Sequence, residues 1–253
     1  MFTSVKTDIE VEAMRVSGRI LATVLAEVEK STQEGVSTGY LASIAERELK
    51  SLGGKPVFKG YGDDVKFPAV ICISVNDEVV HGIPLDEKII KKGDIISIDF
   101  GVKYDGMITD AARTFYVGDV SNQVKKLIIN TEKSMYAGIQ QVRNGVRIGD
   151  ISSAIQKVLV SGGYGIVRDL VGHGVGHSLH EEPDIPNYGF AGSGPTLHTG
   201  MTIAIEPMAT LGTHTVTVDE DHWTIRTADG SLAAHFENTV LITDKGYDIL
   251  TEI

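Results

Sequence analysis

The sequence contains almost no cysteine and no long hydrophobic run. Cys72 is the single cysteine among 253 residues, so an internal disulfide is impossible and a reducing compartment is expected. No stretch approaches the ~18 apolar residues that a membrane-spanning helix needs. The first residues show no apolar segment typical of a signal peptide. Because 42% of the residues are hydrophobic, the chain can bury a core without cross-links. We therefore expect a cytoplasmic protein with no membrane segment.

Positive charge is also scarce. The chain has 23 Lys and Arg against 34 Asp and Glu, a formal net charge of -11, which argues against specific nucleic-acid binding. Lysines nevertheless gather locally, at Lys88, Lys91 and Lys92 and again at Lys125 and Lys126. We interpret them as solvated helix and turn faces; the alternative is a patch for an RNA-bearing partner.

Segments of the second half resemble segments of the first. A capping box at Thr7 and Glu10 predicts a helix whose apolar repeat runs from Ile9 to Val28. The segment GVSTGYLASIA (35–45) then opens a second helix. After another helix capped by Ser121, GVRIGDISSAI (145–155) repeats that pattern, and KKGDIISIDFG (91–101) is matched by HTGMTIAIEPM (198–208). We interpret this order as two related halves, about 1–118 and 119–253, within one domain spanning 1–253. Chance similarity is the alternative.

Acidic residues stand inside apolar strands. A carboxylate on such a strand is costly unless it is paired or binds a cation. A hairpin centred on residues 104–105 would place Asp99 directly opposite Asp110. The turn signal Asp105-Gly106 instead shifts the register, and we expect a bulge to restore a shared face. The runs IAIEPM (203–208) and FENTVLI (236–242) embed Glu206 and Glu237 in the same way, so these acids predict one shared site.

The histidine-rich run GHGVGHSLH (172–180) is the second chemical signal. The spacing of His173 and His177 would suit zinc on a helix, but the alternating glycines disfavour a helix there. As a dinucleotide fingerprint the run lacks its last glycine. The longest irregular stretch follows, from Glu182 to His198, and a loop of this length is often functional. Cys72 lies in the apolar run VICIS, which predicts a buried strand residue.

Five motifs together resemble the type I methionine aminopeptidases across nearly the whole chain. They are HGIP (81–84), DFGVKYDGMITDAARTF (99–115), GHGVGHSLHEEP (172–183), TIAIEPM (202–208) and HFENT (235–239). The resemblance implies the α+β pita-bread fold, in which two pseudo-symmetric halves form a curved antiparallel sheet flanked by helices. It also implies a metalloaminopeptidase that removes the initiator methionine from nascent proteins when the second residue is small.

The same resemblance assigns the metal ligands, which are Asp99, Asp110, His173, Glu206 and Glu237. Asp99 is expected at one metal, His173 and Glu206 at the other, and Asp110 and Glu237 between them. The implied cofactor is a pair of divalent ions, and this oxygen-rich ligand set favours Co, Mn or Fe(II), with Zn as a further candidate. The pair would activate a bridging hydroxide for attack on the first peptide bond.

Further residues receive catalytic and substrate-binding roles from the resemblance. His81 and His180 are expected to contact the substrate rather than the metals, and Glu206 to shuttle a proton. His177 has no counterpart and receives no role. The methionine side chain is expected to bind a pocket formed by Phe67, Cys72, His81, Leu179 and Trp223, although ordinary core packing is the alternative for these residue types. Leu179 lies where many members carry an aromatic residue.

Other classes of function fit the sequence less well. Prolidase and aminopeptidase P share the fold and ligands but usually carry an added N-terminal domain. Type II methionine aminopeptidases have a large insertion between the second histidine and the glutamate, whereas only 25 residues separate His180 from Glu206. A non-catalytic protein of this fold would lack some of the ligands. The expected partners are peptide and nascent-chain N-termini, with transient ribosome association, and we expect a monomer.

Overall fold

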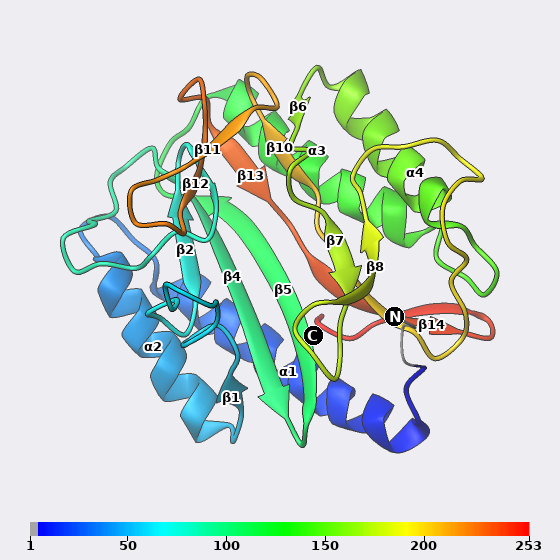
Figure 1. Ribbon diagram of the computed structural model, residues 1–253. Coiled ribbons are helices and arrows are strands. Elements are labelled where there is room, and N and C mark those ends of the chain that lie inside the picture. The colour runs from blue at the N-terminus through cyan, green and yellow to red at the C-terminus, as the bar shows by residue number, and fades with distance from the viewer. Residues whose placement is uncertain (1–4, 253) are drawn as a thin grey trace.

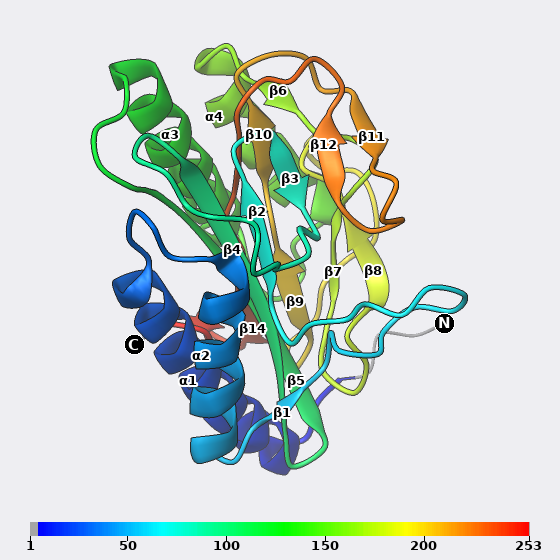
Figure 2. The same cartoon turned by 90° about the vertical axis from the view of Figure 1, so that its left-hand side faces the viewer.

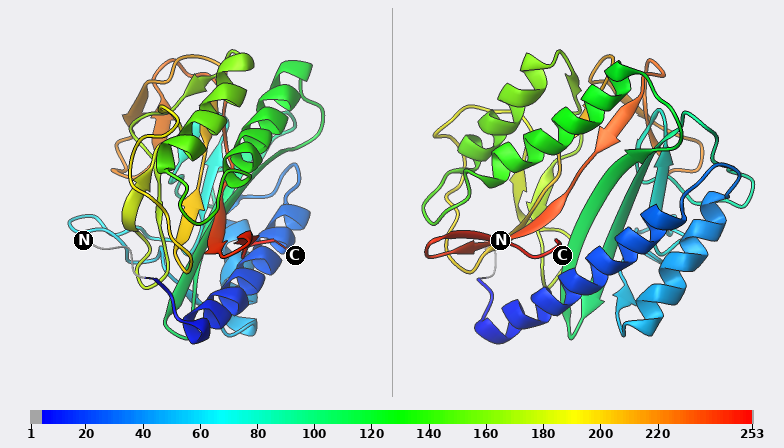
Figure 3. Two further views of the ribbon diagram at one scale, coloured as in Figure 1. Left: turned by 90° about the vertical axis from the view of Figure 1, so that its right-hand side faces the viewer. Right: turned by 180° about the vertical axis from the view of Figure 1, so that it is seen from behind.

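The computed structural model describes residues 5–252, and its four helices lie on one side of the strands (Figures 1 and 2). The helices are α1 (Asp8–Ser31), α2 (Thr38–Ser51), α3 (Asn122–Ile139) and α4 (Ile148–Ser161). Seen from behind, α1 and α2 cover one part of the strands and α3 and α4 another (Figure 3). Among the described residues, no helix is long and apolar enough to cross a membrane. Residues 1–4 of the N-terminal segment lie outside the described residues.

The strands form four small sheets. The first contains β1 (Lys55–Pro56), β2 (Cys72–Val75), β4 (Ile95–Tyr104) and β5 (Met107–Tyr116). The second has the order β15 (Gly246–Ile249), β14 (Asn238–Thr243), β9 (Thr202–Ile205), β7 (Gly172–Gly174) and β8 (Glu181–Ile185). The third joins β13 (Ala233–His235), β10 (Met208–Thr210) and β6 (Gly165–Ile166), and the fourth joins β11 (Val216–Val218), β12 (Ile225–Thr227) and β3 (Glu78–Val80). Every strand pair is antiparallel.

Helix α1 begins with the capping box that the sequence predicts. The Thr7 hydroxyl accepts a hydrogen bond from the Glu10 backbone N–H, and the Glu10 carboxylate accepts one from Thr7 N. The apolar stripe starts one turn later than predicted, because Ile9 is 81% exposed while Ala13 is the first buried apolar residue of the helix. From there the stripe packs on β4 and β5.

The loops that precede α2 and α4 have the same backbone geometry. Gly35 and Gly145 both have positive φ, +87° and +83°, which glycine adopts without steric cost. The Gly35 N–H donates to the Ile90 carbonyl, and the Gly145 N–H donates to the Leu197 carbonyl. These matched contacts support the proposed duplication, while the boundary near residue 118 stays a prediction.

The hairpin of β4 and β5 sets the register of two predicted acids. Asp105 and Gly106 form its turn with φ of +44° and +85°, as tight two-residue hairpins require. Gly101 therefore faces Asp110, and Asp99 faces Ala112, in a ladder without a register shift. The expected bulge is absent from this hairpin. None is needed, because a shift of two residues keeps a side chain on the same face of a strand.

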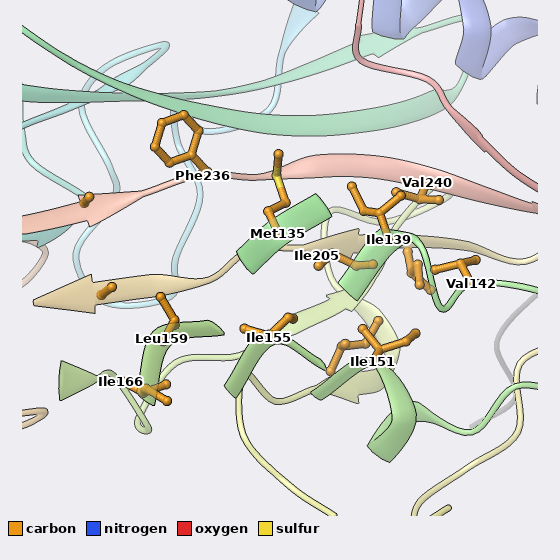
Figure 4. Packing of buried hydrophobic residues seen from close by; sticks show 14 of the residues in the cluster. Met135, Ile139, Val142, Ile151, Ile155, Leu159, Ile166, Ile205, Phe236 and Val240 are labelled. Carbon is orange, nitrogen blue, oxygen red and sulfur yellow. The ribbon is translucent and has the colours of Figure 1, made fainter. Parts of the chain in front are cut away.

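The core lies between the helices and the strands. In the second half, Met135 and Ile139 of α3 and Ile151 and Ile155 of α4 belong to a buried cluster with Ile205 of β9 (Figure 4). The first half repeats the arrangement, with apolar residues of β4 such as Ile98 and Phe100 buried against α1 and α2. Because side chains alternate along a strand, this packing directs Asp99 to the opposite face of β4.

Candidate metal centre

One cavity of about 80 Å³ is lined by every residue predicted to bind metal or substrate. These residues come from many separate elements. Asp99 lies on β4, Asp110 on β5 and His173 on β7, whereas Glu206 follows β9 and Glu237 precedes β14. The others are Phe67, Cys72, His81, Leu179, His180 and Trp223. The fold thus brings residues from both halves of the chain to one place.

A direct contact between the halves places two of the acids. Ala112 of β5 and Glu237 exchange two backbone hydrogen bonds, of 3.2 and 3.0 Å between nitrogen and oxygen. The Arg113 guanidinium reinforces this contact by donating to the carbonyl oxygens of Ala112 and Glu237. Asp110 is held nearby, since its N–H and carbonyl both bond the Thr239 hydroxyl. The two carboxylates are therefore fixed by main-chain contacts.

The geometry of the acid cluster suits a cation. One potential ligand atom from each of Asp110, His173 and Glu237 lies within 4.8 Å of those from the other two, and all three residues are buried. His173 Nε2 lies 3.5 Å from Glu206 Oε1. Asp99 Oδ1, Asp110 Oδ1 and Glu237 Oε1 are buried and have no hydrogen-bond partner among residues 5–252. Orphaned carboxylate oxygens around a neutral imidazole are the donors that divalent transition metals bind, so the residues fit such ions.

Electrostatics lead to the same conclusion. Burial raises the pKa of Asp110 to about 7. Burial and then the neighbouring carboxylates raise the pKa values of Asp99, Glu206 and Glu237 well above their ordinary range. Burial, followed by nearby His180, lowers the pKa of His173 to about 3, which leaves a lone pair free for a metal. A divalent ion would stabilise the charged carboxylates that burial disfavours.

Comparison with known proteins shows the family. The sequence matches the profile described as metallopeptidase family M24 over residues 12–244. The chain belongs to this family. It is 48% identical to a methionine aminopeptidase of Clostridium acetobutylicum over 247 residues, which cover 98% of each protein. The chain also superposes on the crystal structure of a methionine aminopeptidase from Thermotoga maritima. The match covers 100% of each chain, with a TM-score of 0.97 at 45% identity.

A more distant solved structure shows how widely the architecture is shared. A prolidase from Pyrococcus furiosus superposes on 99% of this chain and on 66% of its own length, with a TM-score of 0.79 at 23% identity. That identity supports the fold alone. The predicted α+β pita-bread fold is thereby confirmed for this M24 chain.

His81 and His180, the two histidines predicted to contact substrate, line the same cavity as the acid cluster. His81 follows β3 with a φ of +58°, and its ring packs edge-on against Trp223 at 6.2 Å. Burial, and then the nearby His180, lowers the pKa of His81 to about 4. Burial also lowers the pKa of His180. Both imidazoles are therefore neutral near pH 7, and a neutral ring offers one N–H donor. Their roles stay proposals.

The predicted methionine pocket is apolar and partly aromatic. Phe67 packs edge-on against Trp223 at 5.4 Å and against Phe58 at 6.4 Å. Cys72 and Leu179 belong to the same buried cluster. These residues are core and cavity wall at once, so core packing and a role in the pocket are not exclusive.

Sequence reasoning missed three residues of this region. Phe58 and Tyr61 line the cavity. His235 is 1% exposed, and its Nε2 lies 3.4 Å from Glu206 Oε2. The position of His235 two residues before Glu237, on the same face of an extended segment, is the signal that could have found it.

His177 lies in the histidine loop but does not line the cavity. Its Nε2 lies 2.7 Å from Glu10 Oε1 of α1, and its backbone N–H donates to Glu181 Oε1. Glu181 also accepts a 2.6 Å hydrogen bond from the buried Lys6 ammonium. The expectation of an irregular stretch from Glu182 to His198 was wrong at its start, because β8 extends to Ile185, where it pairs with β7.

Proposed function

We propose that this protein is a methionine aminopeptidase that removes the N-terminal methionine of peptides and nascent proteins. The observation that carries the proposal is a buried acid cluster at the wall of an apolar cavity, with carboxylate oxygens that have no hydrogen-bond partner in the described part of the chain. The acid cluster fits divalent cations, and the apolar cavity fits an unbranched apolar side chain. Membership of the M24 family supports this combination.

The proposed ligands of two divalent cations are Asp99, Asp110, His173, Glu206 and Glu237. Asp110 and Glu237 are the candidates for bridging both ions, as the resemblance implies, and the backbone hydrogen bonds between Ala112 and Glu237 hold β5 beside Glu237. Co, Mn and Fe(II) are the favoured ions, with Zn as a fourth candidate. Bound there, such ions would lower the pKa of a bound water and so supply hydroxide at neutral pH.

The chain's own residues bind and orient the peptide in this proposal. The aromatic and apolar wall, with Cys72, takes the methionine side chain, because aromatic rings make favourable contacts to sulfur. His180 donates a hydrogen bond to the oxygen of the first peptide carbonyl, where charge develops in the transition state. Glu206 accepts and returns the proton, and His81 contacts the peptide beside it.

Specificity gives the first test. The pocket should favour Met-Ala-Ser over Leu-Ala-Ser by about 10- to 200-fold in kcat/KM, the range that shape and apolar contacts provide. Peptides Met-X-Ser with X = Ala, Gly or Ser should be cleaved, and those with X = Lys or Leu should be spared, because this residue must fit beside the metal centre and His81. Steady-state rates across the series measure both effects.

The same series can reject the proposal. Equal rates for X = Lys and X = Ala, or for the leucine and methionine peptides, would indicate a general aminopeptidase. Preferential cleavage of an Ala-Pro peptide would instead indicate a proline-directed activity like that of prolidases, which share this fold. No cleavage of any peptide with metal present would favour a non-catalytic protein.

We further propose that the protein acts in the cytoplasm as a monomer, on chains emerging from ribosomes. Two of the lysines that suggested an RNA-bearing partner form ion pairs, Lys88 with Glu78 and Lys92 with Asp119. This pairing favours the interpretation of those lysines as ordinary surface charge. Any ribosome contact is then weak and transient, which co-sedimentation with ribosomes at low salt would test.

A further inference from the structure

A tight loop presents Tyr61 to the cavity. Gly60 and Gly62 flank it with φ of +86° and +99°, conformations that residues with a Cβ rarely adopt. The Tyr61 N–H donates to the Phe58 carbonyl, and the Tyr61 carbonyl accepts from the Phe67 N–H, both at 2.9 Å. The Tyr61 backbone is therefore held from both sides.

A contact with a distant segment fixes the same loop. A Cβ added to Gly62 would lie 2.6 Å from Cζ2 of the Trp223 ring and 2.7 Å from the Val65 carbonyl oxygen. Only glycine allows this approach, so Trp223 and the loop are packed closely together. The loop backbone and its packing against Trp223 therefore fix the direction of the Tyr61 side chain, even though 41% of the residue is exposed.

The Tyr61 hydroxyl meets His180. Its oxygen lies 2.7 Å from His180 Nδ1, and the two rings pack edge-on with centroids 5.5 Å apart. His173 contacts His180 with ring centroids 4.5 Å apart, so the His180 ring is held between two neighbours. Burial, followed by Asp63, raises the pKa of Tyr61, which keeps the phenol protonated and able to donate.

A neutral imidazole carries its proton on one nitrogen only, and the hydrogen bond at the other nitrogen decides which. If the Tyr61 hydroxyl donates to Nδ1, the proton resides on Nε2. If Tyr61 accepted from Nδ1 instead, Nε2 would be bare and could not donate to a carbonyl oxygen.

We propose that Tyr61 is a positioning residue that donates its hydroxyl proton to His180 Nδ1 and thereby holds His180 as the Nε2–H tautomer, the hydrogen-bond donor for the peptide carbonyl. This inference rests on the proposed function in one respect, the contact of His180 with the substrate. It assigns Tyr61 a task that differs from forming the wall of the methionine pocket.

Kinetics of Tyr61→Phe separate the two tasks. The substitution removes only the hydroxyl, and kcat for Met-Ala-Ser should fall about 10- to 100-fold, by analogy with the loss of hydrogen-bond partners that orient metal-binding histidines. KM and the preference for methionine over leucine should stay unchanged, as should divalent-ion binding measured by calorimetry. In the His180→Ala background, Tyr61→Phe should have no further effect. Tyr40→Phe, at an exposed tyrosine of α2, is the matched control.

A spectroscopic measurement tests the tautomer without relying on activity. Nitrogen-15 spectra of the His180 ring in the zinc-loaded protein should show protonated Nε2 and unprotonated Nδ1, and Tyr61→Phe should produce a mixture of tautomers. This result can be read even if no peptide is cleaved, so its failure is distinct from failure of the proposed function. The inference would be overturned by spectra that show a protonated Nδ1 in the wild type or an unchanged tautomer in the variant. Kinetics that show altered selectivity with unchanged kcat would also overturn it.

Discussion

Replacing Asp110 with asparagine should lower kcat/KM for Met-Ala-Ser by about 10³-fold or more. Asp110 is 4% exposed, and its Oδ1 has no hydrogen-bond partner among the described residues. In the proposal it bridges two cations, and an amide provides neither the charge nor the second acceptor for that task. Metal ions stabilise transition-state charge by several kcal/mol, and each ~1.4 kcal/mol is a factor of ten in rate. Calorimetry should show weakened divalent-ion binding in parallel.

Asp105→Asn is the matched control for this substitution. It makes the same chemical change on the same hairpin, but Asp105 is exposed in the turn. Asparagine tolerates its φ of +44°, so the hairpin should fold normally. Activity and metal binding should stay near those of the wild type. Equal losses in the two variants would mean that the metal site has been misplaced.

Replacing His180 with alanine should lower kcat by about 10²- to 10³-fold, the usual effect of removing a donor to a developing oxyanion. Divalent-ion binding should change little, because the compact group of potential ligands consists of Asp110, His173 and Glu237. The measurement is kcat together with the metal content of the purified variant.

His177→Ala provides the control within the same loop. His177 faces Glu10 of α1 rather than the cavity, so the substitution should leave kcat within a few-fold of the wild type. Loss of metal from the His180 variant in proportion to its loss of activity would make His180 a ligand and refute its proposed contact with the substrate.

The sequence predicted the acid cluster because burial of carboxylates has a strong local signature. Asp99 and Asp110 stand in strands whose alternate residues are apolar, and the Asp105-Gly106 turn is a local signal as well. The prediction of a bulge was wrong. Asp110 pairs with Gly101, two residues from Asp99, and a shift of two residues leaves both side chains on the same face of the hairpin without a bulge.

Features set by distant contacts were missed. The sequence around Tyr61 is a glycine-rich loop, and its path depends on Trp223, which lies far along the chain. His235 was quoted within a motif, but its contact with Glu206 requires β10 and β13 to pair. The exposure of Ile9 depends on where α1 first meets the strands, which periodicity alone does not define.

Adding metal back to the demetallated protein tests the central claim most directly. Cleavage of Met-Ala-Ser should be absent after exhaustive chelation, and it should return when Mn, Co or Fe(II) is titrated in. The account predicts that the rate of cleavage rises in proportion to metal bound at the proposed site, and that Asp110→Asn weakens this binding. Full activity in protein shown to contain no metal would contradict it.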